Sequence, residues 1–105
     1  MLKSLEQGCS GIITATCNVT AELSRRVYDD FFAGNKQLLN DKLCEVRSTF
    51  DKYNLISGLH TYCAQNDNIY RNILPPLNLL NRNDEEELIN RLKDLEFYNK
   101  PTLAA

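Results

Sequence analysis

The stretch "GCSGIITATCNVTAEL", residues 8–23, contains the only convincing β-strand pattern of the sequence. Gly8 and Gly11 bracket a turn, and Ile12–Cys17 is a short uncharged run rich in β-branched residues, which is typical of a strand. Every later segment has a helical or irregular pattern. Because the backbone donors and acceptors of a strand need a partner, this single strand indicates that the rest of its sheet lies elsewhere.

Composition limits the classes of protein to which the chain can belong. It has 105 residues, of which 43% are hydrophobic and 25% charged, as in a globular protein of one domain at most. A net charge of -2 without a basic block disfavours nucleic acid and anionic membranes as partners. No apolar run approaches the roughly 20 residues that span a bilayer, and residues 1–7 lack the apolar region of a signal peptide. We therefore expect a cytoplasmic protein.

The cysteines give little support for a disulfide framework or a metal centre. Cys9, Cys17, Cys44 and Cys63 are expected to be free thiols, because no export signal places them in an oxidising compartment. His60 lies three residues before Cys63, but the sequence has no second ligand pair at the spacing of a zinc finger. The sequence therefore predicts no metal site.

Periodic apolar residues predict helices along most of the chain. Residues 2–5 have the pattern of a helix tail that stops at Gly8. The later helices are predicted as follows: one N-capped by Thr20 and ending near Gly34, one from Asn35 to about Tyr53, one from Leu55 to about Gln65, and a last one capped by Asn83 that buries Leu88, Leu92 and Leu95. Residues 69–80 contain Pro75-Pro76 and are predicted to connect the last two helices.

The helix after Thr20 is predicted to be amphipathic. Its apolar stripe repeats every four residues, and two i, i+4 ion pairs lie on its other face: Leu23, Val27 and Phe31 form the stripe, and Arg25–Asp29 and Arg26–Asp30 form the pairs.

The acidic run "DEEE", residues 84–87, has a structural explanation. Four acids at a helix N-terminus are favoured by the helix dipole, and no apolar residues surround them to raise a carboxyl pKa. The sequence also has no Gly-rich phosphate loop, no G-x-S-x-G elbow and no H-E-x-x-H pair. Local motifs therefore propose no chemistry.

Two segments carry a resemblance to a known family. "GCSGIITATCNV", residues 8–19, resembles the last barrel strand of the dihydrodipicolinate synthase and N-acetylneuraminate lyase family. "LPPLNLLNRNDEEELINRLKDL", residues 74–95, resembles the proline-containing run and closing helix of the same family. The family places three helices between these segments, as the spacing here requires.

The resemblance implies that this chain is a C-terminal fragment of a (β/α)₈ barrel, a fold of about 250 residues. One barrel strand with its flanking helices would occupy residues 1–34, and a C-terminal helical extension would occupy residues 35–105, as a single incomplete domain. The family forms a Schiff base between a lysine and pyruvate or another 2-keto acid, and a tyrosine relays protons. No lysine or tyrosine of this sequence lies on the predicted strand, so the resemblance assigns no catalytic residue here.

The resemblance does assign two substrate-binding positions. The family lines its pyruvate site with the second aliphatic of the strand, which here is Ile13. Sialic-acid lyases have a serine at the position of Ala15, so this departure argues against a sialic-acid substrate. The alternative for Ile13 is plain core packing, since aliphatic residues fill barrel interiors.

Two functions follow from these patterns. The first is the C-terminal portion of a Schiff-base lyase or synthase acting on pyruvate and an aldehyde, without a cofactor, inactive alone and homo-oligomeric at full length. The second is a helical interaction module that docks through its lone strand by β-augmentation. The short, uncharged, apolar strand favours the first, because an exposed strand of this kind promotes aggregation.

Overall fold

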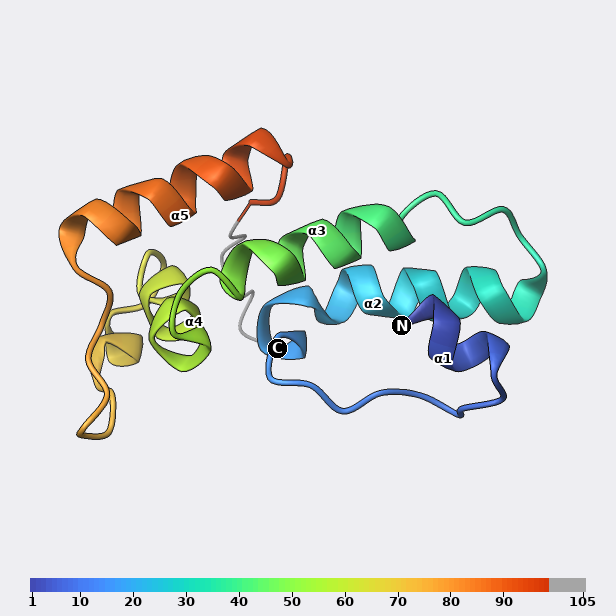
Figure 1. The fold of residues 1–105 in the computed structure, drawn as a ribbon, viewed down its shortest axis with the longest axis horizontal. Helices are drawn as coiled ribbons and strands as arrows, with labels where there is room; N and C mark the ends of the chain where they lie inside the picture. The colour runs from blue at the N-terminus through green and yellow to red at the C-terminus, as the bar shows by residue number, and fades with distance from the viewer. Residues whose placement is uncertain (99–105) are drawn as a thin grey trace. The chain divides into compact units, whose positions relative to one another are not determined.

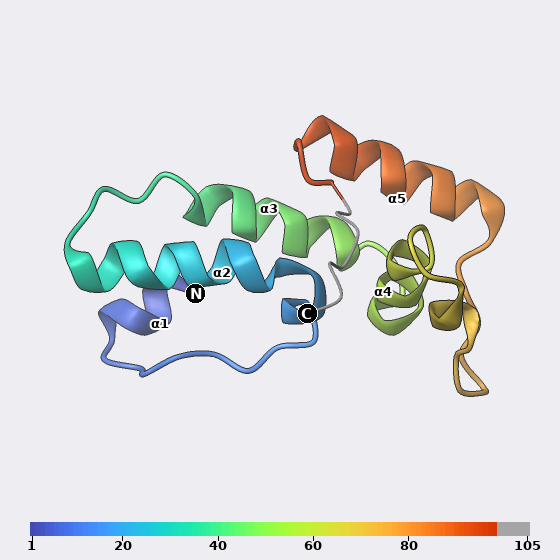
Figure 2. The same ribbon diagram turned by 180° about the vertical axis from the view of Figure 1, so that it is seen from behind.

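The computed structural model describes residues 1–98, and helices are its only regular secondary structure in that range (Figures 1 and 2). In chain order these are α1 (Leu2–Glu6), α2 (Cys17–Ala33), α3 (Asn40–Phe50), α4 (Leu55–Cys63), the 3-10 helix η1 (Asn68–Arg71) and α5 (Arg82–Asp94). The chain forms two compact units, of which the first is Met1–Glu45 and the second begins at Val46.

In the first unit, α1 packs against α2, and both views show the two helices side by side (Figures 1 and 2). Leu5 of α1 and Val27 of α2 are buried. The predicted stops of both helices are confirmed. Gly8 follows α1 with φ 92°, and Gly34 ends α2 in the left-handed region with φ 72°, which glycine adopts without a Cβ clash.

The predicted strand over Ile12–Cys17 is wrong. Residues 9–14 are irregular, residues 15 and 16 form a turn, and Cys17 already begins α2. The physical reason is the absence of a neighbour: within residues 1–98 no second segment adopts an extended ladder with which this one could pair. The mostly helical fold is confirmed, whereas the single barrel strand is not formed.

The start of α2 also differs from the prediction, because Thr16 rather than Thr20 precedes its first residue. Thr20 nevertheless marks a break. Its φ of -114° and ψ of 17° are not helical, and its hydroxyl donates to the carbonyl of Thr16 at 3.0 Å. The residues from Cys17 to Val19 are therefore a short turn joined to the main helix at a kink.

The second unit is built around aromatic and leucine side chains. Phe50, Tyr62, Leu88 and Leu92 are buried. The rings of Phe50 and Tyr62 meet edge to face with their centroids 5.7 Å apart, a preferred arrangement for aromatic pairs. Gly58 brings α4 close to this core, since a Cβ at that position would lie 3.4 Å from the Phe50 ring. This core joins α4 to α5.

Further helix boundaries differ from the predictions, among them the end of α3 at Phe50 rather than about Tyr53. The second predicted helix begins at Asn40 rather than Asn35, and α4 ends at Cys63. The last helix is capped by Asn81 rather than Asn83. The Asn81 side chain accepts from the Asp84 backbone N–H at 2.8 Å and donates to the Asp84 carboxylate at 3.2 Å, which satisfies an otherwise orphaned donor of the first turn.

Truncation of Leu88 tests this core. Leu88→Ala is expected to lower the free energy of unfolding by about 2–5 kcal/mol, because it leaves a cavity at a completely buried position. Leu74→Ala is the matched control, since Leu74 is 82% exposed and its loss should change stability by less than about 0.5 kcal/mol. Urea unfolding followed by circular dichroism measures both, and equal losses for the two variants would contradict the assignment.

Candidate functional site: the segment that precedes α2

The segment between α1 and α2 contains both predicted substrate-binding residues. Of residues 9–16, Ser10–Ile13 form no hydrogen bond within the part of the chain that the structure describes. These four residues are exposed, so water can reach this part of the chain. The segment therefore has the hydrogen-bonding capacity of a strand but no strand beside it.

Ile13 and Ala15 lie on this segment in different environments. The Ile13 side chain is fully exposed, while Ala15 is half-buried in the turn and its carbonyl accepts from the backbone and side chain of Asn18. Of the other residues of the predicted strand, Ile12 is 36% exposed and Thr16 is buried. The segment thus turns its threonines inward and Ile13 outward, and the structure does not gather Ile13 and Ala15 into one pocket.

A cluster of hydroxyl groups connects this segment to α2. The hydroxyls of Thr14 and Thr16 lie 3.1 Å apart, and those of Thr20 and Ser24 lie 3.4 Å apart. The Cys17 thiol lies 3.6 Å from the Ser24 hydroxyl. The hydroxyl cluster, formed by these five residues, consists of neutral donors and acceptors that bond mainly to one another, and Thr16, Thr20 and Ser24 are buried. From the sequence, Thr14 and Thr16 were expected in a strand and Thr20 at a helix N-cap, so the bond from Thr20 to the Thr16 carbonyl was not predicted.

No lysine of residues 1–98 lies on this segment. Among the lysines within residues 1–98, Lys3 lies in α1, Lys42 in α3 and Lys93 in α5, and Lys36 and Lys52 lie in connections. Lys100 falls outside the described residues. The five tyrosines lie in helices or connections, as the sequence predicts. The segment itself therefore supplies no amine for a Schiff base.

The described residues also lack a cluster that could hold a metal ion. No group of three or more histidine, cysteine or acidic side chains converges within residues 1–98. The ring of His60 instead bonds through Nδ1 to the Tyr70 carbonyl at 2.9 Å, which holds η1 against α4. All four cysteines are free thiols, and burial raises the pKa of the Cys63 thiol.

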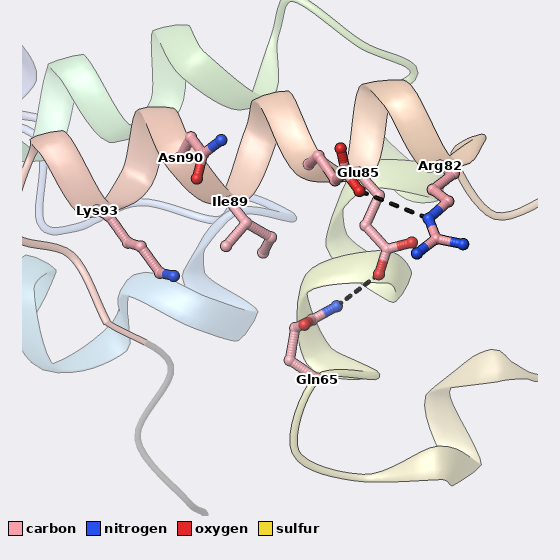
Figure 3. Close-up of a pocket in the computed structure, with 7 residues that line it drawn as sticks. Gln65, Arg82, Glu85, Ile89, Asn90 and Lys93 are labelled. Atoms are coloured by element: carbon pink, nitrogen blue, oxygen red, sulfur yellow. Dashed lines mark hydrogen bonds and ion pairs between the residues drawn. The ribbon is translucent and has the colours of Figure 1, made fainter.

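A surface groove of about 640 Å³ lies along α5 (Figure 3). Its polar groups already bond one another: Gln65 donates to Glu85 at 2.8 Å, and Arg82 lies 3.5 Å from Glu86. Ile89 is the only large apolar side chain among its lining residues. Binding sites for small molecules are mostly apolar with a few convergent polar groups, and this groove lacks that character.

A second groove of the same unit contains a polar contact between residues far apart in the sequence. Glu87 accepts from the Tyr53 hydroxyl at 2.8 Å and from Nε of Arg91 at 3.1 Å. The Tyr53 bond, with help from the Arg91 charge, lowers the pKa of Glu87. Burial and the same bond raise the pKa of Tyr53. No sequence pattern signals this contact, since 34 residues separate its partners.

Among the helices of residues 1–98, none has the length and apolar character of a membrane span.

Comparison with known proteins identifies a family. The model of the Dihydrodipicolinate synthetase family matches residues 1–95, which include the segment before α2, the hydroxyl cluster and nearly all of the second unit described here. No curated protein sequence and no solved structure matches the chain.

Thiol labelling tests the environment of the cysteines. At pH 8, Cys9 and Cys44 should react quickly with iodoacetamide because they are exposed, whereas Cys63 should react slowly because its raised pKa leaves less thiolate. Mass spectrometry of peptides over a time course gives the rates, and labelling in urea should remove the difference. Equal rates for Cys63 and Cys9 in the folded chain would be inconsistent with the structure.

The Tyr53→Phe variant tests the contact with Glu87. Removal of the phenol donor should raise the pKa of Glu87 toward the ordinary range, as measured by NMR titration of its carboxyl group. Because the folded-state pKa is lowered, the stabilisation by Glu87 is complete above the ordinary carboxyl pKa and is lost as pH falls through the lowered value. Tyr70→Phe is the control, and an unchanged Glu87 titration in Tyr53→Phe would refute the contact.

Proposed function

The chain belongs to the Dihydrodipicolinate synthetase family, and from this premise we propose that it is the C-terminal portion of a Schiff-base-forming lyase or synthase. The complete enzyme would join or separate pyruvate, or another 2-keto acid, and an aldehyde. In this proposal the segment before α2 is the last strand of a (β/α)₈ barrel, and α3, α4 and α5 belong to the helical extension. By itself the chain would be inactive.

The main support is the state of Ser10–Ile13 in a chain whose residues 1–95 match the family model. These residues are exposed and form no hydrogen bond within residues 1–98, although Ile12 and Ile13 begin a run with the composition of a strand. Full burial of an isoleucine side chain is worth about 1.5–3 kcal/mol, so an exposed Ile13 forgoes a large stabilisation. Barrel strands on either side would supply both the hydrogen bonds and the burial.

The proposal gives Ile13 and Ala15 roles in substrate binding. Barrel active sites lie at the C-terminal ends of the strands, which is where residues 13–18 would be. Ile13 would then line the pyruvate site, and the methyl group of Ala15 would leave no hydroxyl for a sugar acid. The neighbouring hydroxyl cluster would hold the turn into α2 that fixes both positions.

We propose no cofactor, because the Schiff base itself supplies the electron sink. A lysine amine outside this chain would attack the keto carbon of pyruvate, and loss of water would give the imine. The enzyme would be cytoplasmic and homo-oligomeric.

Borohydride trapping tests the proposal. Hydride reduction of the imine gives a stable secondary amine, so the protein encoded by the longest reading frame containing this sequence should gain one pyruvate adduct on a lysine outside residues 1–105. The present chain, treated identically, should gain none. The proposal fails if the longer protein forms no adduct, or if it contains no repeating β/α units.

The alternative is a non-catalytic helical module that docks through residues 12–17 by β-augmentation. The exposure of Ile13 is compatible with it. A longer protein that forms no adduct and captures an edge strand of another protein through these residues would favour this alternative.

A further inference from the structure

The helix α2 has an exposed face opposite its buried one. Thr20, Ser24 and Val27 are buried on one side. Arg25, Asp29 and Phe32 lie on the other side, at the i, i+4 and i+7 spacing of a single helix face. The side chains of Arg25 and Asp29 are 70% and 56% exposed, and Phe32 is 58% exposed.

Aromatic rings are organised along this face. The Tyr28 and Phe32 rings have centroids 4.6 Å apart, and the Arg25 guanidinium lies 5.1 Å from the Tyr28 ring centroid. These contacts hold the side chains in place before any partner arrives, which lowers the entropy cost of binding. Exposed aromatic and arginine side chains grouped in this way are typical of protein–protein interfaces.

The order of charges on the face is self-complementary. Arg25 precedes Asp29, so a second α2 laid antiparallel across the first would set Arg25 of each copy opposite Asp29 of the other. The same register would place Phe32 beside Ala21 of the second copy, whose small side chain leaves room for the ring. The ion pair within one helix, Arg25–Asp29 at 3.0 Å, is solvent-exposed and can exchange partners at little cost.

We propose that the α2 dimer face, formed by Arg25, Tyr28, Asp29 and Phe32, binds a second copy of this chain in a twofold, antiparallel arrangement. One helix face buries less than the roughly 800 Å² per partner of a stable complex, so the dimer is weak and forms at high protein concentration. Its paired charges make it sensitive to salt. The inference does not rest on the proposed enzymatic function, because it uses only contacts of α2.

Analytical ultracentrifugation of two charge-reversal variants tests the dimer. Arg25→Asp makes the charged pair of the face entirely acidic and Asp29→Arg makes it entirely basic, so each variant alone should lose at least about tenfold in its association constant, which corresponds to about 1.4 kcal/mol. An equimolar mixture of the two should regain association, because the two acidic side chains of one variant would meet the two basic side chains of the other. Restoration in the mixture cannot come from contacts within one helix.

Two further variants serve as a control for charge reversal and as a test of the exposed ring. Arg26→Asp reverses the same charge one residue along, on the flank of the helix, and should leave association unchanged. Phe32→Ala removes the exposed ring without a charge change and should weaken association. Circular dichroism verifies that each variant folds. A monomer mass at every concentration of the natural chain, or a mixture that associates no better than its components, would overturn the proposal.

Discussion

A β-strand needs a neighbouring strand to satisfy its backbone groups, and this requirement determines the state of the first unit. Ile12 and Ile13 begin the run, Ile12–Cys17, that has the uncharged, β-branched composition of a strand, yet the described residues offer it no ladder. The segment therefore remains in solvent, where water can satisfy its amides and carbonyls, and the chain turns directly into α2. The exposed Ile13 and the early start of α2 at Cys17 both follow from this one missing partner.

The second unit does not depend on such a partner. Its helices bury Phe50, Tyr62 and Leu88 against one another, and Asn54 and Asn81 cap α4 and α5. Helices satisfy their backbone hydrogen bonds internally, so they can form wherever an apolar face finds another. A helical extension can therefore fold locally in a chain whose strand lacks a sheet. This fits the proposal that α3, α4 and α5 belong to the helical extension of the enzyme.

The sequence predicted what depends on local pattern and missed what depends on long-range partners. Apolar spacing located α2 to α5, and Gly34 ended α2 as expected. The last cap was misplaced because Asn81 and Asn83 are chemically identical candidates two residues apart. The strand prediction was wrong because a β-branched, apolar pattern shows only that a segment is suited to a sheet. It does not show that a neighbouring strand is present. Ile13 and Ala15 could be named only through the family resemblance, and the contact of Tyr53 with Glu87 had no sequence signature.

Amide hydrogen exchange at Ser10–Ile13 tests the central claim most directly. In the present chain, at concentrations where it is monomeric, we expect these four amides to exchange at nearly unprotected rates while those of Ser24 to Asp30 in α2 are slowed. Strong protection of the four amides in the monomer would show that the segment is already paired within this chain. That result would contradict the view that it is a barrel strand awaiting its neighbours.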